Sequence, residues 1–409
     1  MKIGILTFYR VVNFGANLQA LSTYRYLEKC GHTPIMINYQ SVEMQKSVSQ
    51  RLQTDKQAEA HLRFTDTYLP SQTKICSTPE ELNKTIIELG ITKVIIGSDA
   101  VVQHHPLLSR IHRGRRKPIY VEKMIPERMF PNPFWGDGFP KEIKIALMSA
   151  SSQNSRYDLF SHSLRKKMQM ALSRFSYISV RDSWTQDMLR SITGNSYTKT
   201  PDPVFAFNQN VGDIIPSKEE CLQKYKLPEN YVLVSLMRQS LSTEVLSELK
   251  YFFKKSGLDC VSLPMPTGHG FKHNFEYNIQ EPLDSLDWYA LIKYASGYVG
   301  SNMHPIIVCL HNGVPCYSID NWGTLDFFNR RLDNGSSKVE DIMRLFGVER
   351  NHSFISVNMC NVVPSDIVNA IISFPKESVL KKSQIMYKEY QKMMNDILNS
   401  FDTFCPNII

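Results

Sequence analysis

His304 is the residue of this sequence best placed for acid–base chemistry, because it stands where a short helix is expected to begin. Pro305 suits the first turn of that helix, and Gly313 suits the position just past its end. The free N–H groups at the helix start would face the same spot as His304, Ser301 and Asn302. We predict an anion site with a titratable imidazole beside it; the alternative is that His304 only caps the helix.

Two further segments carry positive charge that could bind an anion. Arg238 follows an expected strand at residues 231–236, and a guanidinium matches a carboxylate or phosphate in two-point geometry. His269 and Lys272 lie between glycines in the segment 266–273, where they could hold a phosphate or a second substrate. Exposed arginines and loops of this composition also occur without a function, so both alternatives stay open.

A hydroxyl and a carboxylate follow the expected strand at residues 93–96. Asp99 could orient or deprotonate a hydroxyl group of a ligand, or it could cap the next helix, and Ser98 precedes it.

The expected strand at residues 3–8 is also followed by polar residues. Asn13 suits a helix-capping turn, Gly15 lets the backbone approach a ligand, and Asn17 adds an amide group. Simple capping is the alternative for Asn13. Because ligands gather at the carboxyl ends of parallel strands, we expect all these residues to line one cleft.

The elements that must position these residues alternate between strands and helices. A strand at 3–8, a helix at 15–30 and a strand at 33–38 make a βαβ unit, which predicts an α/β fold with parallel sheets. The theme recurs with a helix at 79–89 before the strand at 93–96, and the pattern restarts with the strand at 231–236. The long connection between residues 96 and 143 is expected to hang over the cleft.

A chain of 409 residues is too long for one hydrophobic core, because cores stop growing near roughly 250–300 residues. We predict a first domain at residues 1–205, a second at 206–375, and a helical tail at 376–409 that packs across both.

Composition narrows the class of protein. Apolar residues make up 42% and charged residues 21%, as in globular proteins, and a net charge of +8 without interleaved aromatic and basic residues disfavours nucleic-acid binding. The basic run 110–117 could attract phosphates or an anionic membrane surface, or be a solvated loop. Eight scattered cysteines predict reduced thiols and no metal centre. The sequence shows no signal peptide or membrane span, so we expect a cytoplasmic protein.

Taken in order, these strand ends resemble the polysaccharide pyruvyl transferase family. The family motif Ser-Phe-His-Gly corresponds here to Asn302-Met303-His304-Pro305, which keeps the histidine. The matching segments are residues 2–7, 13–20, 96–99, 179–183, 202–204, 301–304 and 310–315.

The resemblance implies two Rossmann-like domains facing a cleft, as in GT-B glycosyltransferases. It implies transfer of an enolpyruvyl unit from phosphoenolpyruvate to a galactose- or mannosamine-type sugar, as a pyruvate ketal with release of phosphate, in capsule or exopolysaccharide biosynthesis. The first domain would hold the acceptor and the second the donor, with no cofactor and no metal. His304 would be the acid and Asp99 the base. Donor binding is assigned to Arg238, Ser301, Asn302 and Arg181; Asn13, Gly15, Asn17, Ser98, His269 and Lys272 would line the acceptor side of the cleft.

Two effects on His304 oppose each other in this scheme. A helix start lowers the pKa of a histidine, whereas a bound dianionic phosphate raises it, and we expect the phosphate to dominate.

Other readings remain at this point. One is a GT-B glycosyltransferase with a nucleotide-sugar donor, and another is a non-catalytic protein that binds polysaccharide intermediates. A lipid-linked acceptor would bring peripheral contact with the inner face of the membrane, assisted by the run 110–117 and by residues 165–167.

Overall fold

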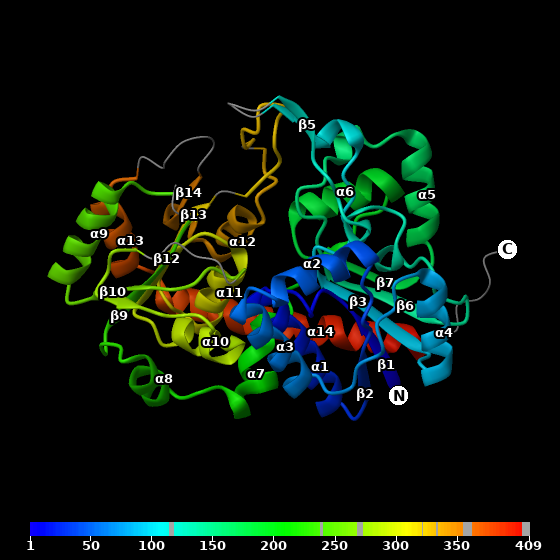
Figure 1. The fold of residues 1–409 in the computed structure, drawn as a ribbon, viewed down its shortest axis with the longest axis horizontal. Helices are drawn as coiled ribbons and strands as arrows, with labels where there is room; N and C mark the ends of the chain where they lie inside the picture. Colours follow the sequence, from blue (N-terminus) through cyan, green and yellow to red (C-terminus); the bar gives the residue numbers. More distant parts are fainter. Residues whose placement is uncertain are drawn as a thin grey trace.

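Two six-stranded sheets, each with helices on both faces, form the body of the molecule (Figure 1). The computed structural model describes residues 1–113, 118–237, 240–267, 273–320, 322–332, 334–354 and 362–402. All strand pairs within the two large sheets are parallel. The prediction of an α/β fold with two parallel-sheet domains is confirmed.

The first sheet has the strand order β2-β1-β3-β6-β7-β8. Its strands are β1 (Lys2–Leu6), β2 (Thr33–Met36), β3 (Lys93–Asp99), β6 (Lys144–Ala150), β7 (Phe175–Val180) and β8 (Thr198–Lys199). The accompanying helices are α1 (Phe14–Lys29), α2 (Val42–Leu52), α3 (Lys56–Tyr68), α4 (Pro79–Leu89), α5 (His162–Leu172) and α6 (Ser183–Thr193). A small antiparallel hairpin, β4 (Ile111–Arg113) and β5 (Ile119–Val121), extends from this domain.

The second sheet has the order β11-β10-β9-β12-β13-β14. Its strands are β9 (Tyr231–Ser235), β10 (Asp259–Ser262), β11 (Tyr277–Asn278), β12 (Gly297–Gly300), β13 (Cys316–Asp320) and β14 (His352–Phe354). The helices that follow the first domain are α7 (Phe207–Val211), α8 (Lys218–Tyr225), α9 (Thr243–Lys255), α10 (Ser285–Lys293), α11 (Met303–Asn312), α12 (Lys338–Phe346), α13 (Pro364–Ile372) and α14 (Lys376–Asp402).

Local sequence signals explain several helix boundaries. The Thr78 side chain accepts a hydrogen bond from the Glu81 amide, Pro79 opens α4, and Gly90 closes it in the left-handed conformation with φ +64°. The expected helix at 79–89 therefore has the bounds that the structure gives it. In contrast, the helices α2 and α3 were not expected.

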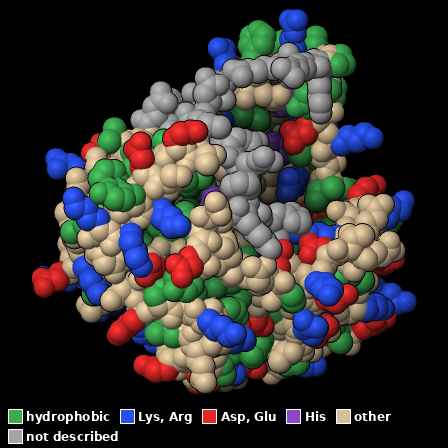
Figure 2. Space-filling model, turned by 60° about the vertical axis from the view of Figure 1, so that its left-hand side comes forward, with side chains coloured by type: hydrophobic (Ala, Val, Ile, Leu, Met, Phe, Trp, Pro, Cys, Tyr) green, Lys and Arg blue, Asp and Glu red, His purple; other side chains and the backbone are tan. Residues whose placement is uncertain are grey.

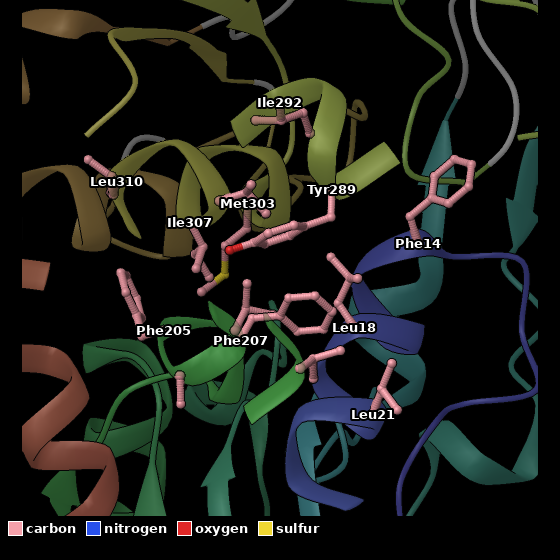
Figure 3. Close-up of a cluster of buried hydrophobic side chains, with 14 of the residues drawn as sticks. Phe14, Leu18, Leu21, Phe205, Phe207, Tyr289, Ile292, Met303, Ile307 and Leu310 are labelled. Carbon is pink, nitrogen blue, oxygen red and sulfur yellow. The ribbon is translucent and has the colours of Figure 1, made fainter. Parts of the chain in front are cut away.

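The largest hydrophobic cluster runs through both domains instead of filling one of them. It contains Phe14 and Leu18 of α1 together with Phe207, Tyr289 and Met303 from beyond the first sheet. Figure 3 shows Leu18 close to the rings of Phe207 and Tyr289, whose centroids lie 4.4 Å apart. Each sheet also has a separate cluster on its other face. The two domains thus share a central core, which fixes one against the other.

The helix α14 crosses the molecule along this shared core (Figure 1). It contacts β6 and β7 of the first sheet and α11 of the second domain. Lys93 donates a hydrogen bond to the Phe401 carbonyl at 2.8 Å, and Leu380 packs against Gly313. The domain boundaries near residues 205 and 375 stay predictions. Among the described residues, no helix has the length and apolar character needed to cross a membrane.

Candidate functional site

A cleft of about 400 Å³ lies between the two domains. The first domain lines it with the β1–α1 loop, with α2 and α3, and with residues that follow β3. The long connection after β3 contributes Ile125 and Arg128, which confirms that this connection reaches over a cleft. The second domain contributes Pro266, Thr267, Asn302, Met303, His304, Trp322 and Lys338. Figure 2 shows a hollow in which acidic, basic and histidine side chains are visible.

Strand order explains why the cleft lies here. In the first sheet the chain places β2 on one side of β1 and β3 on the other, and in the second sheet it places β10 and β12 on opposite sides of β9. Such switch points leave a crevice beyond the carboxyl ends of the central strands. Asp99 ends β3, and the residues Asn302 to His304 follow β12, so both domains direct their switch point at the cleft.

His304 is the second residue of α11 and is 6% exposed. Its ring packs on Gly15 of α1, where an added Cβ atom would lie 2.0 Å from the His304 Cγ atom. Its Nε2 atom lies 3.7 Å from Asp202 Oδ2. Burial lowers the pKa of His304 to about 4, although the Asp202 carboxylate acts in the opposite direction. The imidazole is therefore neutral at neutral pH when the cleft holds no anion.

A buried group of charges lies behind His304. Arg181 Nη1 binds Asp202 Oδ2 at 2.6 Å, and Arg181 Nη2 lies 3.6 Å from Asp99 Oδ1. The Arg181 side chain is 2% exposed, and it is not among the residues that line the cleft. Its geometry fits a role in holding the two carboxylates in place.

Asp99 is the one acidic side chain among the described residues that line the cleft. Burial alone would raise the pKa of this carboxyl group, but Arg181, with His304 and Lys338, lowers it below its ordinary value. Asp99 is thus a carboxylate at neutral pH. A carboxylate of low pKa accepts hydrogen bonds well and is a weak base.

Lys338 faces the same cleft from the first residue of α12. Its ammonium lies 5.3 Å from the centroid of the Trp322 ring, and Trp322 Nε1 donates a hydrogen bond to Asn302 Oδ1 at 3.2 Å. Partial burial, together with Arg181, lowers the pKa of Lys338 below its ordinary value. A cation at the start of a helix also faces the positive end of the helix dipole. An anion bound in the cleft would relieve both effects.

Three arginines add positive charge to the cleft wall. Arg10 is paired with Asp66 at 2.7 Å, and Arg51 is paired with Asp55 at 2.7 Å. The Arg128 guanidinium is exposed and has no ion pair with any residue that the structure describes. Arg128 and Lys338 are therefore the basic groups most available to a ligand.

The backbone is strained at two residues of the cleft. Asp99 has φ +101° and Asn302 has φ +88°, in a region that favours glycine. Such conformations cost about 1–3 kcal/mol each and occur preferentially at functional sites. Asp99 is the last residue of β3 and Asn302 lies two residues beyond the end of β12, so the strain lies where the two domains meet.

Several predicted site residues have structural partners instead of facing the cleft. Ser98 donates to the Ser149 carbonyl at 2.8 Å, and Ser301 donates to the Ile319 carbonyl at 2.7 Å. Asn17 donates to Ser285 Oγ at 3.0 Å, which joins α1 to α10 across the domains. None of the three lines the cleft.

Gly15 and Asn13 have different surroundings. Gly15 makes room for the His304 ring, so the group that approaches its backbone is a side chain of this protein. Asn13 both caps α1, by accepting from the Ala16 amide at 3.3 Å, and lines the cleft. Arg238, His269 and Lys272 lie outside the described residues, as do residues 114–117, which are half of the basic run 110–117.

Sequence reasoning missed four residues of the site: Asp202, Arg10, Arg128 and Lys338. Asp202 lies in a segment that was singled out and Arg10 lies between two such segments, so closer attention to the charged residues there would have found both. Arg128 lies in the long connection, without a local pattern. Lys338 had one signal, a serine before it that suits a helix cap.

Three comparisons with known proteins bear on the chain. The model of the polysaccharide pyruvyl transferase family matches residues 13–323. No curated protein gives a significant match.

Among solved structures, the chain is similar to UDP-GlcNAc 2-epimerases. The enzyme from Neisseria meningitidis bound to UDP-GlcNAc has 11% identity, coverage of 98% of this chain and 100% of that chain, and a TM-score of 0.53. The enzyme from Rickettsia bellii has 10% identity, coverage of 98% and 96%, and a TM-score of 0.53. At such identities the likeness concerns the fold alone, and it confirms the expected GT-B-like pair of domains.

Proposed function

The chain belongs to the polysaccharide pyruvyl transferase family and is a transferase, and we propose that phosphoenolpyruvate binds in the cleft and is its donor. In the overall step a proton adds to the methylene carbon of the donor. Two hydroxyl oxygens of a sugar form bonds to its central carbon, and the bond from that carbon to the phosphate oxygen breaks. The two hydroxyl groups lose two protons in total. The new methyl group accounts for one proton, and the released phosphate takes up the other.

The observation that carries this proposal is the unpaired positive charge of the cleft. Phosphoenolpyruvate carries a phosphate and a carboxylate, so its site needs two sets of cationic or N–H donors. Lys338 and Arg128 supply charge, and the first turn of α11, which has no side-chain cap, supplies free N–H groups at the same cleft. Asp99 is the single carboxylate among the described lining residues, so the net charge there favours a dianion.

His304 is the proposed acid that protonates the methylene carbon. Its ring is neutral in the free protein because its pKa is about 4. A dianion beside the ring raises that pKa, so donor binding would bring the proton that the reaction consumes. Asp202 Oδ2, 3.7 Å from Nε2, would stabilise the resulting imidazolium.

Asp99 is proposed to orient an acceptor hydroxyl group. Its lowered pKa makes it an acceptor of hydrogen bonds more than a strong base. The amide side chains of Asn13, Gln103 and Gln153 line the same cleft and suit the hydroxyl groups of a sugar. We propose a galactose-type sugar on a lipid carrier as the acceptor.

The test is release of inorganic phosphate from phosphoenolpyruvate with a panel of galactose- and mannosamine-containing acceptors, followed by mass spectrometry. We expect acceptor-dependent release and a product heavier than the acceptor by pyruvate minus water. His304→Gln should lose this activity by about 100-fold or more. His162→Gln is the matched control, because His162 is the first residue of α5 and lies outside the cleft.

The same panel decides between donors. If the protein consumes a nucleotide sugar and does not consume phosphoenolpyruvate, it is a glycosyltransferase and this proposal is wrong. A basic cleft also suits the diphosphate of such a donor. Full activity of His304→Gln would remove His304 from the mechanism.

A further inference from the structure

Exposed hydrophobic side chains concentrate at one end of the molecule. Of the eighteen large hydrophobic side chains that are exposed among the described residues, seven lie in three short segments, a far larger share than the length of these segments would give. We call the segments 107–113, 118–123 and 325–331 the tip. The seven side chains are Leu107, Leu108, Ile119, Tyr120, Val121, Phe327 and Phe328.

Both domains build the tip. The Arg113 amide of β4 donates to the Phe327 carbonyl at 2.8 Å, and Asn329 Nδ2 donates to the Tyr120 hydroxyl at 3.1 Å. Figure 1 shows β5 at the top of the molecule, where it meets the segment that follows β13. The tip is thus an ordered surface and not a pair of separate loops.

The hairpin presents its apolar side chains to solvent. Successive side chains of a strand point to opposite faces, so Ile119 and Val121 share one face of β5 and Tyr120 lies on the other, beside the His112 ring. Ile119 is 61% exposed and Leu108 is 68% exposed. A group of exposed apolar side chains of this size indicates a surface that binds a protein partner or a membrane.

Basic residues surround these hydrophobic side chains. The tip contains five basic and two acidic residues, and one basic residue, Arg330, lies over the Phe328 ring at 5.3 Å. In Figure 2 hydrophobic and basic side chains occur together at the top of the molecule. Apolar side chains that enter the boundary of a bilayer, within a basic rim that attracts anionic headgroups, are typical of peripheral membrane proteins.

We propose that the tip binds the surface of a membrane that contains anionic lipids. The chain leads from the tip directly into the cleft, because Ile125 and Arg128 follow β5 and Trp322 precedes Phe327, and all three line the cleft. A bilayer at the tip therefore lies next to the cleft opening. Membrane binding goes beyond the proposed function and does not depend on it.

The test is sedimentation of the full chain with vesicles, in the absence of donor and acceptor. We expect binding to vesicles of equal parts phosphatidylglycerol and phosphatidylcholine, weaker binding to phosphatidylcholine alone, and a further decrease with salt. The variant Leu108→Asp/Ile119→Asp should bind the anionic vesicles at least about tenfold more weakly, because both apolar insertions are lost. Arg113→Glu should weaken binding to anionic vesicles only.

The matched control is Met170→Asp, since Met170 is 66% exposed but lies on α5, outside the tip. It should bind vesicles as the wild type does. Absence of binding to either kind of vesicle would overturn the proposal, and so would equal losses in Met170→Asp and the tip variant. Dissociation of a wild-type oligomer by the tip variant, without a change in vesicle binding, would assign the tip to a protein interface instead.

Discussion

Lys338 occupies an electrostatically unfavourable position in the unliganded protein. It begins a helix, partial burial and Arg181 lower its pKa, and no described residue offers it an ion pair. Its position is explained if the bound donor supplies the missing negative charge.

Replacement of Lys338 should therefore weaken the donor most. A charge-assisted hydrogen bond contributes about 1.5–3 kcal/mol, so Lys338→Met should raise the KM for phosphoenolpyruvate about 10- to 150-fold. Lys338→Arg should recover part of the loss. The control is Lys218→Met, because Lys218 also begins a helix, α8, but lies outside the cleft. An unchanged KM in Lys338→Met would show that the donor binds elsewhere.

Gly15 matters through the ring that it admits. In Gly15→Ala the new methyl group would lie 2.0 Å from His304 Cγ and would displace the imidazole. A displacement of about 1 Å at a catalytic group costs about 100-fold in turnover, which steady-state phosphate release would detect. Gly212→Ala is the control, since nothing lies within 4 Å of its added Cβ atom. Normal turnover of a folded Gly15→Ala protein would contradict the proposed position of the acid.

The sequence predicted which segments form the site better than it predicted which side chains in those segments line the cleft. His304 and Asp99 were predicted from strand ends, and the structure places both in the cleft. Ser98 near the end of β3 and Ser301 just after β12 have hydroxyl groups that donate to buried carbonyls of neighbouring segments. Those partners are set by the tertiary structure and leave no mark in the local sequence.

The elements α2 and α3 show a different limit of sequence reasoning. Both line the cleft and neither was expected, whereas α4 was predicted with its exact bounds. α4 has a capping threonine, an opening proline and a closing glycine. α2 has Met44 as its single buried residue, so it lacks the apolar stripe from which a helix is recognised.

The helix α14 should contribute to the stability of both domains. Ile397 is 0% exposed within the shared core, so Ile397→Ala should lower the free energy of unfolding by about 2–5 kcal/mol. Ile385 lies on the same helix but is 48% exposed, and Ile385→Ala should change it by less than about 0.5 kcal/mol. Urea denaturation measures both. Equal effects of the two substitutions would show that α14 is not packed as described.

At the level of the entire protein, the buried histidines make the free energy of unfolding depend on pH. Burial lowers the pKa of His61, His104 and His105 to about 4, from an ordinary value of 6.5, and it also lowers the pKa values of His304 and His311. Between pH 4 and pH 6.5, the unfolded chain therefore binds protons on these histidines that the folded chain does not bind.

The free energy of unfolding should therefore contain the full contribution of these neutral histidines above pH 6.5, and it should decrease as the pH falls towards 4. Each such histidine adds a slope of up to about 1.4 kcal/mol per pH unit. Urea denaturation at pH 7.5, 6.0 and 5.0 would measure the slope, and a folding free energy that does not change over this range would contradict the burial of these rings.

Calorimetry of phosphoenolpyruvate binding, in buffers of different ionisation enthalpy, tests whether the donor lies against His304. Since the His304 pKa is about 4 in the free protein, a donor that raises it should bring proton uptake at neutral pH. His304→Gln should still bind the donor but with less proton uptake than the wild type, a comparison that cancels the protons of the donor itself. Binding with identical proton uptake in both proteins, or no binding at all, would contradict the placement of phosphoenolpyruvate against His304.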